Sequence, residues 1–462
     1  MKTIVISIFD SNMVRNILRT DVFRVLKEDT NIGKIALLVH PTKLELYTKE
    51  FGGGKVVLDT YPSNLPSRSE LVLWFLLRHS IHTNNVRAKI NELRYTSKGS
   101  WFARTVKYVA ALFAFYLTYI PPFDTILRVL ARYVHQSDLF APLIKKYQPD
   151  LVFLPTIFAH NDIRLLKWCT DHHVPTIGMI KSWDNLIGKD PLLMWPDRLI
   201  VHNEIVRDLA WSMHRFPQNR IYVSGIPQMD MYADASLIPN KAALFEKYHL
   251  DMHKRLVMYT AVGRLISYHE VDVIKYLADV VKDLPEPTQL LVRLHPAYPS
   301  DDTVVENIPR VIVVRPGMAG AERNPLRFDF EFRDDEVRDL MGMLAHADVI
   351  IQSGSTTAID AACFDTPIIS MGFDGYAKKV REEESTSRLL KKDHFARILA
   401  THGTRAVYTP DELRNTLIAY LKDRSLDHEG RMRIVAEQCY KLDGKAGERI
   451  GHYISAVVRE LA

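Results

Sequence analysis

Short apolar runs alternate with helical patterns from the first residues of the chain onward. Aliphatic and β-branched residues at 4–9, 35–39 and 56–58 predict short buried strands. The stretches 14–27 and 43–50, which lie between them, have the apolar spacing of amphipathic helices. Strands that alternate with helices predict a parallel sheet covered by helices.

The alternation continues, and it is interrupted only near residue 240. Before that point we expect helices at 139–147 and 163–170 and strands at 151–154, 176–180, 198–201 and 221–223. After it we expect strands at 256–260, 289–294, 311–314, 349–351 and 368–371 and helices at 269–282, 335–345 and 358–364. The pattern predicts an α/β fold of two Rossmann-like domains, residues 1–240 and 241–430. A helical segment, 431–462, then follows and could cross back to the first domain.

The composition of the chain indicates which partners and which cellular compartment to expect. The 462 residues are 47% hydrophobic and carry a formal net charge of only +5, with dispersed basic residues, so nucleic acid is not an expected partner. Cys169, Cys363 and Cys439 are far apart and predict no disulfide framework, which favours a reducing compartment. The first residues lack a signal-peptide cleavage pattern and are typical of a strand. We expect a cytoplasmic protein.

One segment, 108–123, is uncharged and rich in aromatic residues. It is flanked by Arg104, Lys107, Arg128 and Arg132, and it is short for a membrane span. A buried helix is the first interpretation. Docking on a membrane surface, with a peripheral location at its inner face, is the second.

A hydroxyl-rich turn follows the predicted strand 349–351. Its residues are Ser353, Gly354, Ser355, Thr356 and Thr357, and a helix begins directly after them. The first N–H groups of a helix lack intrahelical acceptors and attract anions, so the turn is a candidate diphosphate site. The alternative is a hydroxyl that only caps a structural helix.

Two neighbouring strand ends carry further candidates. Arg293 and His295 close the predicted strand 289–294, and Thr260, Gly263 and Arg264 follow the strand 256–260. Ligands of open parallel sheets bind outside the carboxyl ends of strands, so we expect these residues to converge with the hydroxyl-rich turn around phosphate oxygens. Each of them, taken alone, has a structural alternative.

The first domain offers acceptor-side candidates. Trp183, Asp184 and Asn185 follow the strand 176–180, and Asp10 and Asn12 follow the first strand. Asp184 is our candidate for the general base that removes a proton from an attacking hydroxyl. Its alternative is a carboxylate that caps the next turn, with Trp183 as core filling. No motif in the chain calls for a metal or a cofactor.

Taken together, these segments resemble the GT-B glycosyltransferase superfamily. They are most similar to the clan of CDP-glycerol glycerophosphotransferases and related capsule or surface-polysaccharide transferases. The resemblance covers roughly residues 150–380. It rests on a Gly-x-Pro-x-x-Asp element within 223–230, a strand-and-Thr element at 257–264 and a His-Pro element at 293–296. Ser355, Thr356, Asp360 and Pro367 match the clan's Ser-Ser-x-x-x-Asp/Glu signature.

The resemblance implies two doubly wound parallel-sheet domains facing a cleft, with a nucleotide donor held by the second domain without a metal. Arg264, Arg293 and His295 would then stabilise the leaving diphosphate together with the turn 353–357. Asp360 and Asp374 would contact the ribose or the donor hydroxyls.

The chain has Ser182 to Asn185 where the glycerophosphotransferase pattern has a His-Gly element. This departure favours sugar transfer from a nucleotide-sugar to a cell-envelope or surface polysaccharide, with a glycan or lipid-linked acceptor. Three alternatives stay open: a non-hydrolysing UDP-sugar 2-epimerase, a glycerophosphotransferase and a non-catalytic GT-B-like scaffold.

Overall fold

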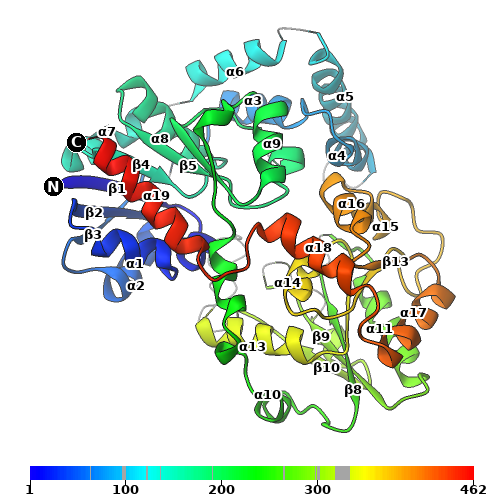
Figure 1. The fold of residues 1–462 in the computed structure, drawn as a ribbon. Helices are drawn as coiled ribbons and strands as arrows, with labels where there is room; N and C mark the ends of the chain where they lie inside the picture. The colour runs from blue at the N-terminus through cyan, green and yellow to red at the C-terminus, as the bar shows by residue number, and fades with distance from the viewer. Residues whose placement is uncertain are drawn as a thin grey trace. The chain divides into compact units, whose positions relative to one another are not determined.

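The structure, a computed structural model, consists of two compact units, each built on its own parallel sheet (Figure 1). Unit 1 comprises Met1–Asp230 and Gln438–Ala462, and unit 2 comprises Met231–Glu437. The residues that the structure describes are 1–62, 64–95, 100–120, 123–135, 137–189, 191–263, 266–296, 298, 302–317 and 333–461.

Unit 1 contains a seven-stranded parallel sheet with the order β3-β2-β1-β4-β5-β6-β7. Its strands are β1 (Lys2–Ile8), β2 (Ile32–Val39), β3 (Val56–Thr60), β4 (Leu151–Leu154), β5 (Thr176–Met179), β6 (Arg198–Val201) and β7 (Ile221–Val223). Successive side chains of a strand point to opposite faces, so Ile4 and Ile6 enter one hydrophobic cluster and Val5 enters another. Both faces of the sheet are therefore covered by helices. The chain order reverses between β1 and β4, which makes this edge the switch point of the sheet.

The helices of unit 1 come from both ends of the chain. They are α1 (Asp21–Glu28), α2 (Leu44–Phe51), α3 (Arg68–Arg78), α4 (Asn84–Tyr95), α5 (Trp101–Leu117), α6 (Phe123–Val134), α7 (Ala141–Tyr147), α8 (His160–Asp171), α9 (Glu204–Ser212) and α19 (Ala446–Glu460). Helix α19 packs on α1, and its N-terminus is held by Asp230. The Asp230 carboxylate accepts hydrogen bonds from the N–H groups of Ala446 and Gly447, at 2.9 and 2.7 Å. The last residue of the Gly-x-Pro-x-x-Asp element thus anchors the carboxy-terminal helix.

Unit 2 contains a six-stranded parallel sheet with the order β10-β9-β8-β11-β12-β13. Its strands are β8 (Arg255–Thr260), β9 (Thr288–Arg293), β10 (Val311–Val314), β11 (Val349–Gln352), β12 (Ile368–Met371) and β13 (Arg405–Val407). Its helices are α10 (Lys241–Lys247), α11 (Glu270–Lys282), α12 (Asp302–Glu306), α13 (Asp334–His346), α14 (Thr357–Cys363), α15 (Ser387–Leu390), α16 (Asp393–Ala400), α17 (Pro410–Lys422) and α18 (His428–Cys439). The switch point lies between β8 and β11.

The sequence prediction of an α/β fold with two Rossmann-like parallel sheets is confirmed. The expected strands are present within two or three residues of their predicted ends, but β13 and the helices α3, α4, α6, α9, α10, α12 and α15 to α17 were not anticipated. The expected helix 14–27 is divided into a π-helical turn, Val14–Leu18, and α1. The chain passes from unit 1 to unit 2 at Asp230, whereas the sequence pattern placed a boundary near residue 240.

The interpretation of 108–123 as a buried helix is correct for one face only. Helix α5 begins before residue 108, and its buried side chains are Ala111, Ala114 and Phe115. Val109, Phe113 and Tyr116, on the other face, are exposed. Residues 121 and 122 of the segment lie outside the described part of the chain. Within the described part, no helix is long and apolar enough to cross a membrane.

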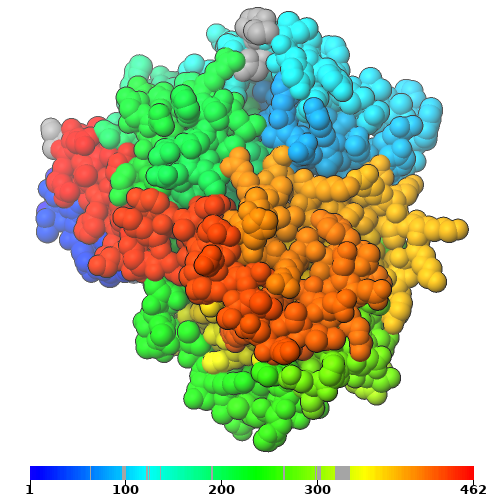
Figure 2. All heavy atoms as spheres, turned by 45° about the vertical axis from the view of Figure 1, so that its right-hand side comes forward, coloured from blue at the N-terminus to red at the C-terminus, as the bar shows by residue number. Residues whose placement is uncertain are grey.

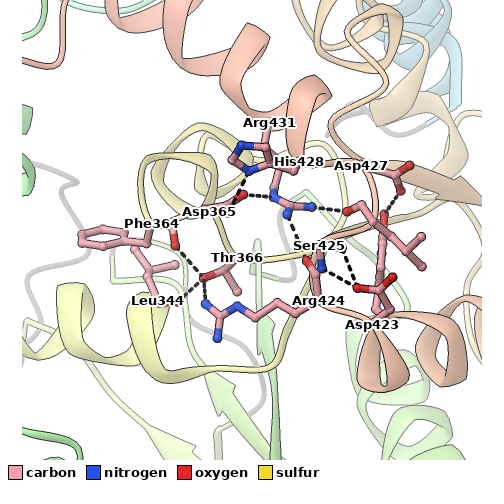
Figure 3. Close-up of polar contacts among 12 residues, drawn as sticks. Leu344, Phe364, Asp365, Thr366, Asp423, Arg424, Ser425, Asp427, His428 and Arg431 are labelled. Atoms are coloured by element: carbon pink, nitrogen blue, oxygen red, sulfur yellow. Dashed lines mark hydrogen bonds and ion pairs between the residues drawn. The ribbon is translucent and has the colours of Figure 1, made fainter.

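A polar network joins α18 to the crossover between α14 and β12 (Figure 3). The buried guanidinium of Arg431 donates to the Asp365 carboxylate at 2.7 Å and to the carbonyl oxygens of Arg424 and Leu426. His428 contacts the second oxygen of Asp365 at 2.9 Å. Asp365 precedes β12, so this network lies toward the amino end of that strand. Its role is structural.

Candidate functional site

The carboxyl ends of β9, β8 and β11 are neighbours in unit 2, because these strands are adjacent in the sheet. Thr260 and Arg293 are direct register partners, and the N–H of Ala261 donates to the Arg293 carbonyl at 2.9 Å. The loops that carry Thr260, Arg293 and Ser353 therefore leave the sheet side by side. The structure brings together the three strand ends that the sequence pattern predicted to converge.

The loop after β8 is fixed by a buried carboxylate. Glu270, the first residue of α11, accepts hydrogen bonds from the N–H of Val262 at 2.7 Å and from the N–H of Gly263 at 3.0 and 3.1 Å. Gly263 has a φ of +82°, and a Cβ added there would lie 2.4 Å from the Cβ of Tyr298. Only glycine fits this close approach without displacing the neighbouring loop.

His295 is oriented by the backbone of its own loop. The N–H of Tyr298 donates to His295 Nδ1 at 2.9 Å, and the two rings stack with their centroids 4.6 Å apart. Because Nδ1 accepts, the neutral imidazole carries its proton on Nε2. His295 is therefore held as a hydrogen-bond donor through Nε2.

The turn after β11 is held by side chains of the sheet. Gln352 accepts from the N–H of Ser355 at 2.7 Å and donates to Ser370 Oγ at 2.7 Å. The hydroxyls of Ser355 and Thr357 lie 3.1 Å apart. Gly354 has a φ of +68°, and a Cβ there would meet the Cβ of Leu389 at 2.8 Å. The turn has a defined shape before any ligand arrives.

Several hydroxyls at this edge are buried without a hydrogen-bond partner in the structure. They belong to Tyr259, Thr260, Ser267 and Ser353. The Tyr259 hydroxyl interacts with that of Ser353, but neither makes a hydrogen bond of acceptable geometry, and burial raises the pKa of Tyr259 well above its usual range. Thr260 lies next to Tyr259 in β8, so its side chain points to the opposite face of the sheet. Buried polar groups in proteins are normally bonded, and an unbonded group indicates a missing ligand or water.

Arg293 lies among acidic and phenolic groups. Burial lowers the pKa of Arg293, whereas Tyr232, Asp360 and Glu336 favour its charged form. The Tyr232 hydroxyl donates to Asp360 at 3.2 Å. Thr356 is the N-cap residue of α14, and its side chain makes no capping hydrogen bond. Arg293 is therefore a half-buried cation at the end of β9, and its charge is favoured by the Asp360 carboxylate of α14.

Asp374 and Arg264 complete the predicted donor-side residues. The Asp374 carboxylate accepts from Ser385 Oγ at 2.5 Å and from the N–H of Thr386 at 2.8 Å, so it positions that turn. Arg264 lies outside the described residues.

In unit 1, Asp10 is paired with a lysine that our site prediction did not include. Asp10 Oδ2 lies 2.5 Å from Lys181 Nζ, and Asp10 Oδ1 accepts from the backbone and side chain of Asn12. Burial alone would raise the pKa of Asp10, but the Lys181 charge and hydrogen bonds outweigh it and the pKa lies below its usual range. The ends of β1 and β5 thus carry one polar cluster.

Asp162, in the first turn of α8, joins this cluster. Its Oδ2 accepts from the N–H of Ala159 at 3.0 Å, while Oδ1 is buried without a hydrogen-bond partner. Burial, reinforced by the Asp10 charge, raises the pKa of Asp162 to about 7. Burial and the nearby Asp162 and Asp10 carboxylates raise the pKa of Tyr61 to about 12. Asp162 is a carboxyl group that is partly protonated near neutral pH.

The acceptor-side candidates after β5 occupy one short turn. Ser182 Oγ donates to Asp184 Oδ1 at 2.7 Å, and Asp184 and Trp183 are both half-buried. Asn185 is buried, and its Oδ1 has no hydrogen-bond partner. Asp184 keeps access to solvent, which a proton acceptor for an incoming hydroxyl requires.

Sequence reasoning missed Glu270, Lys181, Asp162 and Tyr61. Glu270 and Asp162 both lie in the first turn of a helix that follows a strand, where acidic residues are common for dipole reasons alone. That position therefore gave no functional signal. Lys181 directly precedes the Ser-Trp-Asp-Asn segment, and its charge beside a strand end was an available signal.

The described residues contain no group of three or more His, Cys, Asp or Glu side chains that could hold a metal ion. Among the cavities lined by described residues, two lie elsewhere. One of about 630 Å³ borders α11 and α12, and one of about 350 Å³ borders α1 and α19. Neither is lined by the predicted site residues.

Solved structures share this architecture. The Staphylococcus aureus MnaA–UDP structure matches with a TM-score of 0.57 and 13% identity, covering 99% of this chain and 97% of its own. UDP-GlcNAc 2-epimerase from Neisseria meningitidis, bound to UDP-GlcNAc, matches with a TM-score of 0.53 and 9% identity, covering 99% and 100%. A glycosyltransferase from Rickettsia africae matches with a TM-score of 0.50 and 11% identity, covering 100% and 98%. At such identities the likeness shows the fold, which is the two-domain Rossmann-like GT-B fold.

The family is shown by the sequence match. The model described as "CDP-Glycerol:Poly(glycerophosphate) glycerophosphotransferase" matches residues 189–456, more than half of the chain. The chain belongs to this family, and it is a transferase of the GT-B kind. Among curated proteins, none matches the chain significantly.

Proposed function

We propose that the protein transfers a sugar from a nucleotide-activated donor to a cell-envelope or surface polysaccharide. The observation that carries the proposal is the set of buried hydroxyls of Tyr259, Thr260 and Ser353 without a hydrogen bond at the ends of β8 and β11, the sheet edge at which Arg293 ends β9. A diphosphate needs several hydrogen-bond donors and a positive charge. Hydroxyls that make no hydrogen bond within the protein can donate to it without breaking one. The UDP and UDP-GlcNAc named for two structures of the same fold agree with a nucleotide-sugar donor.

In the proposed reaction, the acceptor hydroxyl attacks the anomeric carbon of the donor sugar. The new glycosidic bond forms as the bond between that carbon and the β-phosphate oxygen breaks, and the nucleoside diphosphate leaves with the electron pair. Arg293, His295 Nε2–H and the turn 353–357 stabilise the charge that develops on the leaving group. Asp184 accepts the proton of the acceptor hydroxyl. No metal takes part.

Glycerophosphate transfer is the second candidate, and the family match favours it. The two candidates differ in the bond that breaks. Glycerophosphate transfer releases a nucleoside monophosphate, because the attack is on phosphorus, whereas sugar transfer releases a nucleoside diphosphate. Analysis of the nucleotide released from UDP-sugars and from CDP-glycerol therefore separates them. An epimerase would instead convert the donor sugar without acceptor.

The donor site is tested by removing two of these hydroxyls. Thr260→Val and Ser353→Ala should leave thermal stability nearly unchanged, while the shift in melting temperature caused by the preferred nucleotide among UDP, CDP and GDP falls. The matched control is Thr366→Val, whose hydroxyl donates to the Leu344 carbonyl at 2.6 Å. This control should lose stability and keep the nucleotide shift. Unchanged nucleotide shifts in both site variants would contradict the proposal and favour a scaffold.

A further inference from the structure

The carboxyl ends of the unit 1 strands carry buried polar atoms of their own that make no hydrogen bond. Asp162 Oδ1 follows β4, Asn185 Oδ1 follows β5 and His202 Nε2 follows β6. The three residues are 0%, 1% and 3% exposed. Because β4, β5 and β6 are neighbours in the sheet, these atoms belong to adjacent loops at one edge. Buried polar groups are normally hydrogen-bonded, so a set of unbonded ones at a single edge indicates a ligand.

The charged core of this edge is the Asp10–Lys181 pair. Ile8 of β1 and Met179 of β5 enter the same hydrophobic cluster, which α1 and α19 cover. The red spheres of α19 lie beside the blue spheres of the chain's first residues in Figure 2. Asp10 and Lys181 each follow two residues later in the chain, and their ion pair places both at the end of this face. Asp162 interacts electrostatically with both, so the three side chains form one cluster.

Part of this cluster is open to solvent. The Lys181 side chain is 29% exposed, and Trp183 and Asp184 in the turn after it are half-buried. An ammonium group has three N–H donors, and Asp10 takes one of those of Lys181. An indole presents an apolar face with a polar edge, which suits the C–H face and the hydroxyls of a sugar ring. A ligand can therefore approach from the side of Lys181 and Trp183.

The donors and acceptors of this edge match a hydroxyl group better than a phosphate group. A hydroxyl both donates and accepts, so it can satisfy the Asn185 carbonyl oxygen, which only accepts. Burial lowers the pKa of His202 to about 4, so its ring is neutral near pH 7 and can donate or accept. An ionised phosphate only accepts and would leave the Asn185 oxygen unbonded. It would also meet the carboxylates of Asp10 and Asp184, which outnumber the ammonium group of Lys181.

We propose that this edge of unit 1 binds an uncharged, hydroxyl-rich ligand, and that this ligand is the terminal sugar of the acceptor. Only the second part rests on the proposed function, because a neutral sugar can bind whether or not a transfer follows. The acceptor of this protein then ends in a neutral saccharide rather than in a polyol phosphate. Asp184 precedes Asn185 in the chain, so the group that accepts the proton adjoins the site that holds the sugar.

The test is saturation-transfer difference NMR on the full chain. The probes are the methyl glycosides of glucose, galactose, mannose and N-acetylglucosamine, with sn-glycerol 3-phosphate as the charged polyol. We expect magnetisation transfer to at least one methyl glycoside and weaker transfer to glycerol 3-phosphate. Asn185→Leu and His202→Phe each remove one unbonded polar atom at similar side-chain volume. Each should weaken glycoside binding about threefold or more.

The matched control is Asn219→Leu, an exposed asparagine that precedes β7 and thus lies toward the amino end of that strand. It should leave glycoside binding unchanged, and circular dichroism checks that each variant is folded. The nucleotide-induced shift in melting temperature reports on unit 2 and should persist in Asn185→Leu. Thr260→Val should show the reverse, with a smaller nucleotide shift and unchanged glycoside binding.

These two readouts separate this inference from the proposed donor site. Glycoside binding without any nucleotide shift would uphold the unit 1 site and contradict the donor site. Three results would overturn the inference: no transfer to any methyl glycoside, equal glycoside binding by Asn185→Leu and Asn219→Leu, or stronger transfer to glycerol 3-phosphate than to every glycoside.

Discussion

The carboxylate of Glu270 holds the N–H groups of Val262 and Gly263 at 2.7 to 3.1 Å. These bonds fix the loop that follows β8 at the switch point of the unit 2 sheet. Glu270 is buried at the start of α11, so it shapes the candidate donor site from outside the loop itself. The loop therefore depends on a residue that no donor needs to touch.

Glu270→Ala should release this loop. It leaves two buried N–H groups without an acceptor, at about 1–3 kcal/mol each, and we expect nucleotide affinity to fall on the order of tenfold. Glu270→Gln keeps one carbonyl acceptor and should be milder. Asp411→Ala, which removes an exposed acid from the first turn of α17, is the control and should change neither quantity. Nucleotide titration by calorimetry measures the effect; equal affinities in all three variants would remove Glu270 from the site.

Gly263→Ala should distort the contact between two loops. The new Cβ would lie 2.4 Å from Tyr298 Cβ and 2.5 Å from its carbonyl oxygen, and the φ of +82° adds backbone strain. We expect a loss of about 2–3 kcal/mol in the free energy of unfolding, together with weaker nucleotide binding. Gly53→Ala also has a positive φ but meets no atom within 4 Å, so it should cost only about 1 kcal/mol. Urea denaturation measures the free energy of unfolding of both variants. Similar losses would show that Tyr298 moves aside to accommodate the new Cβ.

Asp162 should make stability depend on pH. Its pKa is raised from 3.8 to about 7 in the folded state, so the folded protein binds the proton more tightly than the unfolded chain. The stabilising contribution is fully present below about pH 4 and is lost as the pH rises through about 7. Asp162→Asn should remove this slope, and near pH 8 it should be more stable than the parent by on the order of 1–4 kcal/mol. The test compares the denaturant midpoints of the parent and of Asp162→Asn from pH 5 to 8. If the two proteins have identical pH profiles, Asp162 is ionised throughout this range.

Arg431→Met should destabilise the protein without weakening nucleotide binding. The buried guanidinium bonds to Asp365 and to two carbonyl oxygens, so its loss should cost about 2–4 kcal/mol. Asp365 precedes β12, at the sheet edge opposite the candidate donor site, so the nucleotide dissociation constant should stay unchanged. His428→Ala removes only the exposed partner of Asp365 and should cost less than about 1 kcal/mol. A large change in affinity with Arg431→Met would contradict the placement of the site.

Much of the fold follows from the chain's own periodicity. β-Branched runs such as 349–351 and 368–371 can be buried on both faces only in a parallel sheet covered by helices, so pattern and architecture agree. The sequence did not predict β13, because its three residues, Arg405–Val407, are too few and too polar to form a hydrophobic pattern. The first interpretation of 108–123, a buried helix, holds for one face of α5 only, because uncharged aromatic composition does not distinguish a core helix from one that is exposed on one side.

The sequence by itself determined which loops end at the candidate donor site, because parallel strands bring their carboxyl ends to one edge. It also determined the family, through motifs that local spacing preserves. Only the tertiary structure decided that Glu270 holds the Gly263 loop, that Lys181 pairs with Asp10, and that Asp230 anchors α19. Partners such as Asp10 and Lys181 are remote in the chain, and their pairing depends on the order of strands in the sheet. Burial, which sets the pKa of Asp162 and leaves the site hydroxyls unbonded, arises only when the whole unit packs.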